Sequence, residues 1–497
     1  MSFLSYSFLA ALPLAAIIHA VLPAVWMKNA FLLIVSLLFY GSNGAECILV
    51  LALSTGITYA GGLLMAKSSG PRRKTVFLIS LVLNLSILVV IKYTGFFISS
   101  LNQLLGLVQV GGLPVPAILQ PIGLSFIIFQ SCTYLFDLRA GKIDTERNLL
   151  RHALFVSFFP TLVCGPIQRA ADFFPQLRDR KNPTFREAQG AVVLLLWGFF
   201  LKLVIADRIA MFTDLVFGNT EQYSGAVLLG GALLYSLQIY LDFAGYSWMA
   251  IGTARLFGFA LKDNFRQPYL AVRMADFWRR WHISLTGWFT DYVYIPLGGN
   301  RKGAFRRYLN ILIVFLISGL WHGASWTFVI WGALHAAYQI VGYLTARIRV
   351  GLLARLGIDP QSAAHRFFQR LLLFLLVSLA WVFFRSGTPA QALSYIRGIF
   401  LNLNPGALFD GTLFTAGLTI ADWNLLVVCL LVVLAVSLLL EKAGRGSPGC
   451  LCSASAVLDR QSVLCRMLII LFLFTLIIIF GVYGEGYSAS AFIYAGF

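Results

Sequence analysis

A histidine, His322, lies within a long apolar run of the sequence. The run reads Leu-Trp-His-Gly-Ala-Ser-Trp-Thr-Phe-Val-Ile-Trp-Gly from Leu320 to Gly332, inside an apolar stretch from Leu309 to Tyr343. Ionisable side chains are costly in such segments, so they more often line a cavity, form pairs or take part in chemistry. A histidine held by a neighbouring backbone carbonyl is the structural alternative. The position of His322 therefore makes it a candidate for function.

A carboxylate, Asp242, lies late in another apolar segment, which reads Tyr-Leu-Asp-Phe-Ala-Gly-Tyr-Ser-Trp from Tyr240 to Trp248. Such a group should face the protein interior and find a hydrogen-bond donor there. We expect an arginine or a tyrosine to supply the donor, and we expect the role of Asp242 to be structural.

Basic and aromatic residues are concentrated between 262 and 307. Apolar residues recur there at spacings of three and four, which predicts one stripe of an amphipathic helix; they are Phe277, Trp281, Leu285 and Trp288. A glycine-rich turn follows, with Gly298 and Gly299 close to Arg301. Tryptophan and arginine suit the headgroup region of a membrane.

Basic side chains and backbone amides at a membrane surface can hold the phosphates of a donor such as a coenzyme. We expect the contacts to such a donor to come from Arg279, Arg280, Trp281 and Arg301. Attraction of the same charges to anionic lipid is the structural alternative.

The composition indicates what kind of chain holds these residues. Of 497 residues, 59% are hydrophobic and 12% are charged, and the mean hydropathy is +0.81, which is outside the range of soluble globular proteins. The formal charge of +18 is divided among clusters between apolar segments, as in the cytoplasmic loops of membrane proteins. The sequence therefore predicts a polytopic membrane protein in contact with membrane lipids, and no nucleic-acid partner.

Apolar segments of about 20 residues, the length that crosses a bilayer, predict about twelve transmembrane helices. The N-terminus lacks the features of a cleaved signal and is expected to form the first of them. The segments lie near 4–25, 29–45, 47–66, 75–98, 117–137, 188–206, 225–248, 308–324, 326–346, 366–386, 423–441 and 466–484. The basic loops predict the cytoplasmic side and put both termini outside; they are 67–74, 139–186, 262–307, 347–370 and 442–466.

Residues 151–176 are apolar but are interrupted by Pro160, Gly165, Pro166 and Pro175. Both flanks carry cytoplasmic signals, so we expect a re-entrant or interfacial element. Irregular backbone at membrane depth survives only where it is buried in protein or lines a wet cavity. An ordinary helix-turn-helix at the interface is the alternative.

The seven cysteines indicate neither a disulfide framework nor a metal site. Cys450, Cys452 and Cys465 lie near a basic loop, but without a nearby histidine they are a poor ligand set for zinc. Cys164 is a candidate for a thiol acyl-enzyme, although a buried cysteine more commonly packs than reacts. The sequence has no Gly-x-Ser-x-Gly element for a serine nucleophile.

The order of the motifs resembles the membrane-bound O-acyltransferase family, and more closely its bacterial branch for alginate O-acetylation and teichoic-acid D-alanylation. The resemblance rests on Pro-Ile-Gly-Leu-Ser-Phe at 121–126, on Trp-His-Gly-Ala-Ser-Trp at 321–326, and on segments 159–169, 241–252, 276–299 and 492–497. These motifs extend over nearly the whole chain in the family's order. The tail departs from the pattern at Ala495 and Gly496, where a bulkier polar residue is expected.

The resemblance implies an all-α polytopic membrane domain over residues 1–497, with a ring of about 11–12 transmembrane helices and re-entrant or interfacial helices around a central funnel. It also implies that an acyl group from a cytoplasmic thioester reaches an acceptor on the other side. His322 matches the family's intramembrane catalytic histidine, and His282 matches its second histidine. The remaining histidines match no functional position of the family; they are His19, His152, His335 and His365.

Acyl transfer from a thioester to a hydroxyl requires removal of the hydroxyl proton during the attack. A neutral histidine suits this task, because its reference pKa lies near neutrality and desolvation lowers it further. We therefore expect His322 to act as a general base, a contribution of about 10²–10⁴-fold. For His282 three roles stay open: orienting the donor, polarising its carbonyl or relaying protons.

The leading hypothesis is an acetyltransferase of the bacterial inner membrane. Acetyl-CoA would be the donor, no metal would be needed, and periplasmic O-acetyltransferases or acetyl-acceptor proteins would be partners in the acetylation of alginate or cellulose. Transfer of D-alanyl or another acyl group from a carrier protein is an alternative of the same class. A proton-coupled transporter that uses His322 and Asp242 is an alternative of another class, although the internal repeats common in transporters are not found.

Overall fold

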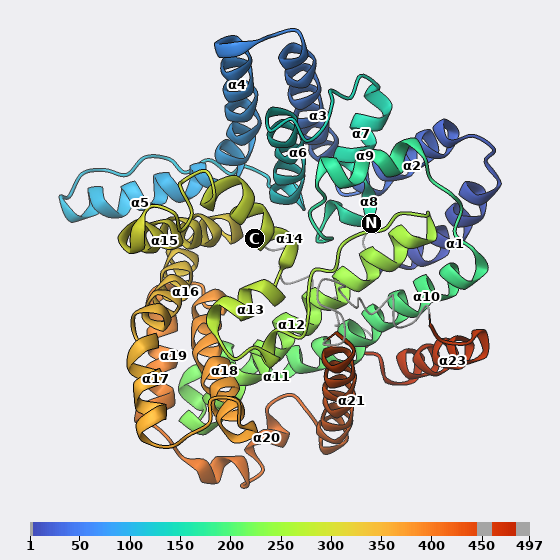
Figure 1. Cartoon of the computed structure of the whole chain (residues 1–497). Coiled ribbons are helices and arrows are strands. Elements are labelled where there is room, and N and C mark those ends of the chain that lie inside the picture. Colours follow the sequence, from blue (N-terminus) through green and yellow to red (C-terminus); the bar gives the residue numbers. More distant parts are fainter. Residues whose placement is uncertain (1–2, 445–459, 484–497) are drawn as a thin grey trace. The chain divides into compact units, whose positions relative to one another are not determined.

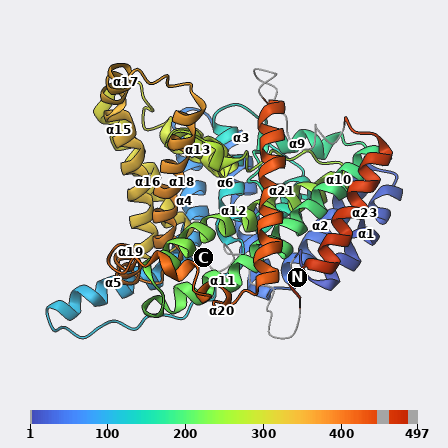
Figure 2. The ribbon, with the colours of Figure 1, turned by 90° about the horizontal axis from the view of Figure 1, so that it is seen from below.

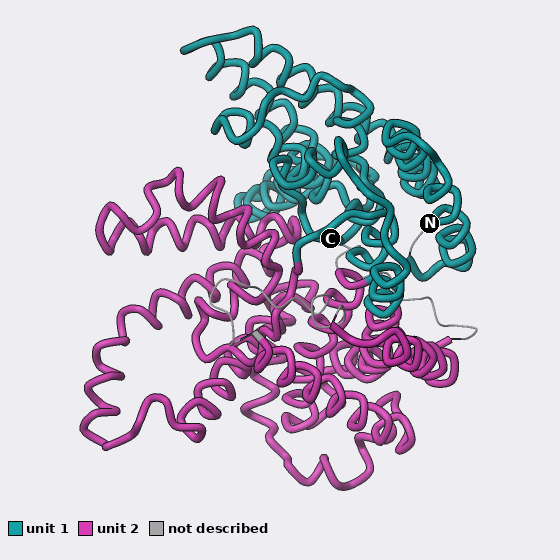
Figure 3. The backbone as a smooth tube through the Cα atoms, turned by 45° about the vertical axis from the view of Figure 1, so that its right-hand side comes forward, with its two compact units in different colours: residues 1–195, 249–262 teal, residues 196–248, 263–497 magenta. Residues whose placement is uncertain are grey.

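The computed structural model describes residues 3–444 and 460–483, and within these ranges every regular element is a helix. The chain divides into two compact units (Figure 3). Unit 1 contains residues 1–195 and 249–262, and unit 2 contains residues 196–248 and 263–497. Two helices, α10 (Phe185–Phe199) and α12 (Gly225–Leu256), begin in one unit and end in the other. The single domain predicted over residues 1–497 stays a prediction.

The apolar segments of the sequence form helices, and each predicted crossing falls on one of them. Among the described residues, eight helical stretches are long and apolar enough to cross a membrane: Ala45–Ala66, Gly70–Leu107, Phe185–Gly218, Gly225–Leu256, Gly303–His322, Ala363–Arg385, Ile420–Ala443 and Val463–Phe480. Two shorter apolar helices precede them in the chain, Tyr6–Val21 and Val25–Gly41. The protein is therefore a multi-pass, all-helical membrane protein, as predicted. The total number of crossings and their orientation stay predictions.

In unit 1, both neighbouring helices and helices distant in the sequence pack together. α3, α4 and α6 contact one another, and α2 packs on α7 (Figure 1). The bounds are α1 (Tyr6–Val21), α2 (Val25–Gly41), α3 (Ala45–Ala66), α4 (Gly70–Leu88), η1 (Val89–Tyr93), α5 (Thr94–Leu107), α6 (Leu124–Arg139), α7 (Leu149–Ser157), α8 (Phe159–Leu162) and α9 (Ala170–Arg178).

The proline-rich stretch of unit 1 is broken into the three short helices α7, α8 and α9. α7 has nine residues, or about 14 Å at 1.5 Å per residue, which is too short to cross a hydrocarbon core of about 30 Å. The backbone turns at Phe158 and again over residues 163–169. Phe155, Phe158 and Cys164 are fully buried there. Irregular backbone inside a membrane protein is tolerated where it is buried in protein, and this stretch meets that condition.

Polar side chains of α6 supply hydrogen bonds to the backbone of this broken stretch. Gln130 donates to the carbonyl oxygen of Phe155, and its own oxygen accepts from the Gln168 amide at 3.3 Å. Asp137 accepts from the backbone amide of Ala171, in the first turn of α9, at 3.2 Å. The loop before α6 also approaches closely: Gly123 has φ +76°, and a Cβ there would lie 2.2 Å from the Leu162 oxygen. The prolines break the helix, and hydrogen bonds from α6 stabilise the irregular backbone that results.

Unit 2 contains the second half of the chain. Its elements, besides the parts of α10 and α12, are η2 (Phe200–Ala206), α11 (Asp207–Gly218), η3 (Thr220–Gln222), η4 (Pro268–Leu270), α13 (Met274–Arg280), α14 (Ile283–Phe289), η5 (Thr290–Tyr294), α15 (Gly303–His322), α16 (Trp326–Leu344), α17 (Ala346–Arg355), α18 (Ala363–Arg385), α19 (Pro389–Leu401), η6 (Pro405–Leu408), α20 (Thr412–Thr415), α21 (Ile420–Gly444) and α23 (Val463–Phe480). α16 packs between α15 and α18, and Figure 2 shows α16 and α18 side by side.

Glycines allow α15 and α16 to approach each other at backbone distance. A Cβ on Gly319 would lie 2.2 Å from the carbonyl oxygen of Phe328, and one on Gly332 would lie 2.3 Å from that of Phe315. Small residues at such positions are typical of tightly packed membrane helices. This packing fixes the end of α15, where His322 lies.

Candidate functional site

His322 is the last residue of α15, at the point where the chain turns into α16. The residue is 2% exposed, and its ring centroid lies 4.9 Å from that of Trp321, 5.0 Å from that of Trp331 and 5.3 Å from that of Phe384. A Cβ on the next residue, Gly323, would lie 2.1 Å from the Phe328 ring. The glycine turn and the aromatic rings together hold the imidazole in a buried position.

His282 begins a new helix instead of continuing the one before it. The sequence predicted one amphipathic helix through residues 277–288, and the continuity of that helix was wrong. α13 ends at Arg280 and α14 begins at Ile283, because His282 adopts a left-handed backbone with φ +42° and ψ 56°. That conformation is unfavourable for a residue with a Cβ, so surrounding contacts must hold it.

Asn264 holds both His282 and the start of α14. The Asn264 Oδ1 atom accepts from the backbone amide of Ser284 at 3.2 Å and from its hydroxyl at 3.0 Å, and it lies 3.1 Å from His282 Nδ1. Because a backbone N–H can only donate, this side-chain atom must be the amide oxygen, and His282 Nδ1 must carry a proton to donate to it. In the neutral imidazole the lone pair is then on Nε2.

The two predicted histidines come together around one indole. The ring centroid of Trp321 lies 5.9 Å from that of His282 and 4.9 Å from that of His322. Phe243 of α12 packs edge-on against His282 at 4.7 Å. Residues distant in sequence therefore form one buried aromatic cluster, which we call the histidine cluster: His282, His322, Trp321, Trp331, Phe243 and Phe384.

Burial determines the protonation of His282. The residue is fully buried, and desolvation lowers the pKa of its imidazole from 6.5 to about 3. His282 is therefore neutral at physiological pH. In this state its Nε2 atom can accept a proton or a hydrogen bond, but it cannot donate one.

The residues expected to contact a donor differ in their surroundings. Trp281 is fully buried, and its ring stacks on that of Phe277 at 5.5 Å. Arg280 is engaged with two carboxylates, at 3.0 Å from Asp276 and 2.7 Å from Glu441. Arg279 and Arg301 are exposed. Of the four, the two exposed arginines are therefore the ones best placed to meet a phosphate.

Asp242 pairs with a lysine, a partner that the sequence did not suggest. Lys202 Nζ lies 2.7 Å from Asp242 Oδ1 and 2.8 Å from Asp207 Oδ1, and all three side chains are 1% exposed. Lys202 projects from the π-helical turn η2. A Cβ on Gly245 would lie 2.8 Å from the Gly198 oxygen, so α12 approaches the segment before η2 closely. We call these three residues the ion cluster.

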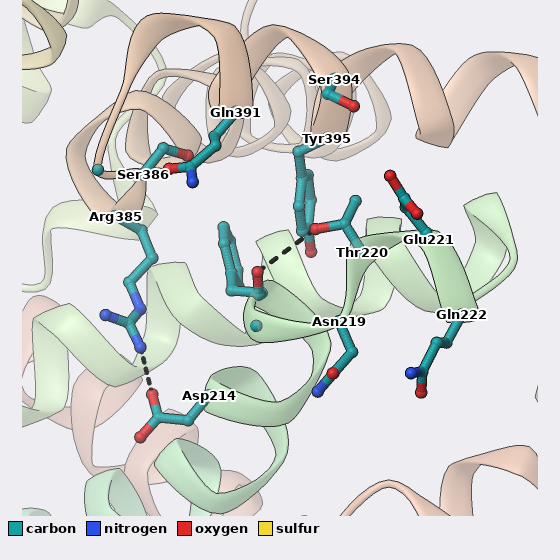
Figure 4. Close-up of a pocket in the computed structure, with 13 residues that line it drawn as sticks. Asp214, Asn219, Thr220, Glu221, Gln222, Arg385, Ser386, Gln391, Ser394 and Tyr395 are labelled. Carbon is teal, nitrogen blue, oxygen red and sulfur yellow. Dashed lines mark hydrogen bonds and ion pairs between the residues drawn. The ribbon is translucent and has the colours of Figure 1, made fainter.

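A polar cavity of about 570 Å³ lies in unit 2, where α11, η3, α18 and α19 meet (Figure 4). Arg385 and Asp214 form an ion pair of 2.6 Å on its wall. Amide and hydroxyl groups, including those of Asn219, Gln391 and Ser394, line it together with Glu221 and Phe217. Arg385 directly follows Phe384, whose ring contacts His322. The end of α18 thus connects the cavity with the histidine cluster.

Within the described ranges, no group of three or more His, Cys, Asp or Glu residues is arranged to hold a metal ion. Cys164 is fully buried in unit 1. Cys450, Cys452 and the motif at 492–497 lie outside the described residues.

Comparison with known proteins places these features in a family. The family model described as "MBOAT, membrane-bound O-acyltransferase family" matches residues 65–350. The chain is 36% identical over 404 residues to a probable alginate O-acetylase of Pseudomonas putida, which covers 80% of this chain and 76% of the relative.

Two other relatives carry different names. A peptidoglycan O-acetyltransferase of Helicobacter pylori is 33% identical over 408 residues, 76% of this chain and 73% of the relative. A teichoic acid D-alanyltransferase of Bacillus subtilis is 28% identical over 232 residues, 43% of this chain and 57% of the relative. The extent of these matches, together with the all-helical membrane fold, shows that the chain belongs to the membrane-bound O-acyltransferase family of acyltransferases.

Proposed function

We propose that the protein moves an acetyl group from acetyl-CoA, on the cytoplasmic side of a bacterial inner membrane, for the O-acetylation of an exopolysaccharide of the alginate or cellulose type. The observation that carries the proposal is the meeting of His282 and His322 at Trp321. Similarity to probable alginate O-acetylases supports the substrate class.

In the proposed step, the oxygen of an acceptor hydroxyl attacks the carbonyl carbon of the thioester. His322 accepts the hydroxyl proton, the carbon–sulfur bond breaks, and the new carbon–oxygen bond completes the ester. The thiolate leaves and takes up a proton. The neutral imidazole is the form that a general base requires.

For His282, the hydrogen bond to Asn264 favours two of the three roles that the sequence left open. With the proton on Nδ1, the Nε2 atom can accept a hydrogen bond from an amide of the donor or relay a proton. Polarising the thioester carbonyl would require a donor at Nε2, which this tautomer lacks. We propose that His282 orients the donor or relays the proton, and that Arg279 and Arg301 contact its phosphates.

The acceptor would approach from the side of the polar cavity at Arg385. The loops around it, 207–224 and 387–422, carry few basic residues and are predicted to lie outside the cytoplasm. Its hydroxyl and amide lining suits a hydroxyl-rich acceptor or the surface of a periplasmic acetyl-acceptor protein, which we propose as the partner.

The test is transfer of radiolabelled acetyl groups by purified protein in liposomes, with acetyl-CoA and a periplasmic acetyltransferase as acceptor. We expect His322→Ala to lower the rate by about 10²–10⁴-fold while the protein stays monodisperse. His335→Phe is the matched control, since His335 is a fully buried imidazole in the same helix pair, 4.8 Å from Trp331 between ring centroids. Retained transfer by His322→Ala would show that another group is the base.

Acyl transfer from a carrier protein is the second candidate, supported by the similarity to a teichoic acid D-alanyltransferase. The same liposomes would be given a carrier protein loaded with a D-alanyl thioester. Turnover of that donor, without turnover of acetyl-CoA, would replace the first proposal.

A further inference from the structure

Lys28 and Arg180 are buried cations of unit 1 whose hydrogen-bond partners are neutral. Lys28, in the first turn of α2, and Arg180, just after α9, are each 7% exposed. Lys28 Nζ donates to Asn182 Oδ1 at 2.6 Å. Arg180 donates from Nη1 to Asn29 Oδ1 at 3.3 Å and from Nη2 to His19 Nε2 at 3.1 Å.

The imidazole in this group is neutral where it meets the guanidinium. Arginine can only donate, so the Nε2 atom of His19 must accept and carries no proton. The charges of both Arg180 and Lys28 act on His19, which places it within the field of two cations. Among the described residues, no carboxylate lies within ion-pair distance of either cation.

Neighbouring contacts fix the geometry of the cluster. The guanidinium of Arg180 lies 4.0 Å above the ring of Phe259. The side-chain amide of Asn29 donates to the Leu177 oxygen at 2.8 Å, and that of Asn182 donates to the Ala20 oxygen at 2.9 Å. Both amides therefore present their oxygens to the cations. Each side chain of the cluster is therefore held in place by a hydrogen bond or a ring contact.

A second turn of chain closes over Arg180. Gly258 has φ +79°, and a Cβ there would lie 2.5 Å from the Lys181 oxygen and 3.1 Å from Arg180 Cγ. Only glycine allows this approach. The resulting burial lowers the pKa of the Arg180 guanidinium to about 10, and its Nε is buried with no hydrogen-bond partner.

A buried charge without an opposite charge is strongly unfavourable, and proteins normally pair such groups. Guanidinium and ammonium groups are the donors that proteins use for phosphate oxygens. Asn182, at the rim, is exposed and leaves a route for a ligand. The described residues supply no anion to these two cations, and the exposed side at Asn182 leaves room for one to bind.

We propose that Lys28, Arg180 and Asn182 form a binding site for a phosphate-bearing group. The segment 139–186 is one of the basic loops that predict the cytoplasmic side, where both phospholipid headgroups and soluble phosphates are present. The site belongs to unit 1 and does not depend on the role proposed for His322.

The test compares the melting temperature of the whole protein in phosphatidylcholine nanodiscs with that in discs that also contain phosphatidylglycerol. A parallel arm titrates inorganic phosphate into phosphatidylcholine discs, with chloride at equal ionic strength as reference. We expect one of the two additions to raise the melting temperature of the wild type by about 2 °C or more. Lys28→Met and Arg180→Lys should lose most of this rise.

Lys262→Met is the matched control, since Lys262 is an exposed lysine of unit 1 that is paired with Asp172. It should keep the full rise. A response to phosphatidylglycerol alone identifies a lipid headgroup, and a response to phosphate alone identifies a soluble anion. No response to either, or a response that Lys28→Met retains in full, overturns the proposal. Should Arg180→Lys fail to fold, Lys28→Met alone decides.

Discussion

The ion cluster and the histidine cluster are both buried in unit 2, and they keep ionisable groups away from water in opposite ways. In the ion cluster, Lys202 lies 2.7 Å and 2.8 Å from the carboxylates of Asp242 and Asp207. In the histidine cluster, His322 is enclosed by the rings of Trp321, Trp331 and Phe384. The first pairs opposite charges, and in the second three aromatic rings pack against an imidazole.

The difference separates a structural task from a chemical one. Pairing makes each member of the ion cluster dependent on the others, since removing one partner strands a buried charge. An imidazole among aromatic rings can be neutral, and a neutral imidazole is ready to accept a proton. We therefore infer that the ion cluster holds η2 and α12 together and that the histidine cluster performs the transfer. Four predictions test this comparison.

The largest effect on stability is expected from Lys202→Met. It leaves the carboxylates of Asp207 and Asp242 buried without their shared cation, at a cost of about 3–5 kcal/mol. We expect a large loss of folded protein, measured by size-exclusion chromatography and melting temperature. Asp242→Asn should cost less, because Lys202 keeps Asp207 as a one-to-one partner. Equal losses in the two variants would contradict the account of the cluster.

The next largest effect is expected from Asn264→Ala. The change removes the acceptor for the Ser284 amide and for His282 Nδ1, and each buried donor left without an acceptor costs about 1–3 kcal/mol. Both the melting temperature and the acetyl-transfer rate should fall. Asn264→Asp keeps an acceptor oxygen and should recover more activity than Asn264→Ala. If the two variants behave alike, Asn264 does not position His282.

A third prediction concerns pH. The pKa of His282 is about 3 in the folded protein and about 6.5 in the unfolded chain, so between these values the unfolded state binds the extra proton. The contribution of His282 to the free energy of unfolding is complete above pH 6.5. As the pH falls below 6.5, this free energy decreases by about 1.4 kcal/mol per pH unit. His282→Gln should therefore lose less stability than the wild type between pH 6.5 and pH 5.

Comparing the two proteins removes contributions that they share. One of these contributions comes from Asp263, because burial raises its pKa to about 6. Below that pH, the titration of Asp263 changes the free energy of unfolding in the opposite direction to that of His282. The melting temperatures of wild type and His282→Gln should differ by a constant amount above pH 6.5 and converge below it. A constant difference throughout the range would mean that His282 is not held neutral by burial.

The smallest effect is expected from Arg385→Met at the rim of the polar cavity. Its ion pair with Asp214 is 2.6 Å long, but the two side chains are 37% and 56% exposed. Exposed pairs contribute about 0–1 kcal/mol, so the melting temperature should hardly change. A fall in acetyl transfer with an unchanged melting temperature would support an acceptor site at the cavity. A stability loss as large as that of Lys202→Met would remove the distinction between exposed and buried pairs.

Much of the local structure could be predicted from the sequence. Each predicted crossing coincides wholly or largely with helix, because a backbone in hydrocarbon must satisfy its hydrogen bonds within itself. The prolines at 160, 166 and 175 mark the broken stretch, since proline lacks the amide that a helix requires. The predicted crossing near 308–324 put His322 close to the end of a helix, and His322 is the last residue of α15.

The partners of these residues could not be predicted in the same way. Lys202 lies within an apolar segment and gave no local signal that it would meet Asp242. Asn264 is separated from His282 by 18 residues, and no spacing rule links them. The break at His282 also escaped prediction, because apolar spacing of three and four is the same in one helix or in two short ones.

The sequence by itself determined that this is a helical membrane protein, where its helices fall, and which histidines are candidates for acyl transfer. The first two depend on hydropathy and on residues near one another in the chain, and the histidine candidates rest on the apolar run around His322 and on the resemblance of the motifs to the family. Only the tertiary structure decided that His282 and His322 share Trp321, that Asn264 fixes the tautomer of His282, and that Lys202 holds two carboxylates. These depend on hydrogen bonds and ion pairs that form when distant segments pack, because burial makes such contacts strong and their absence costly.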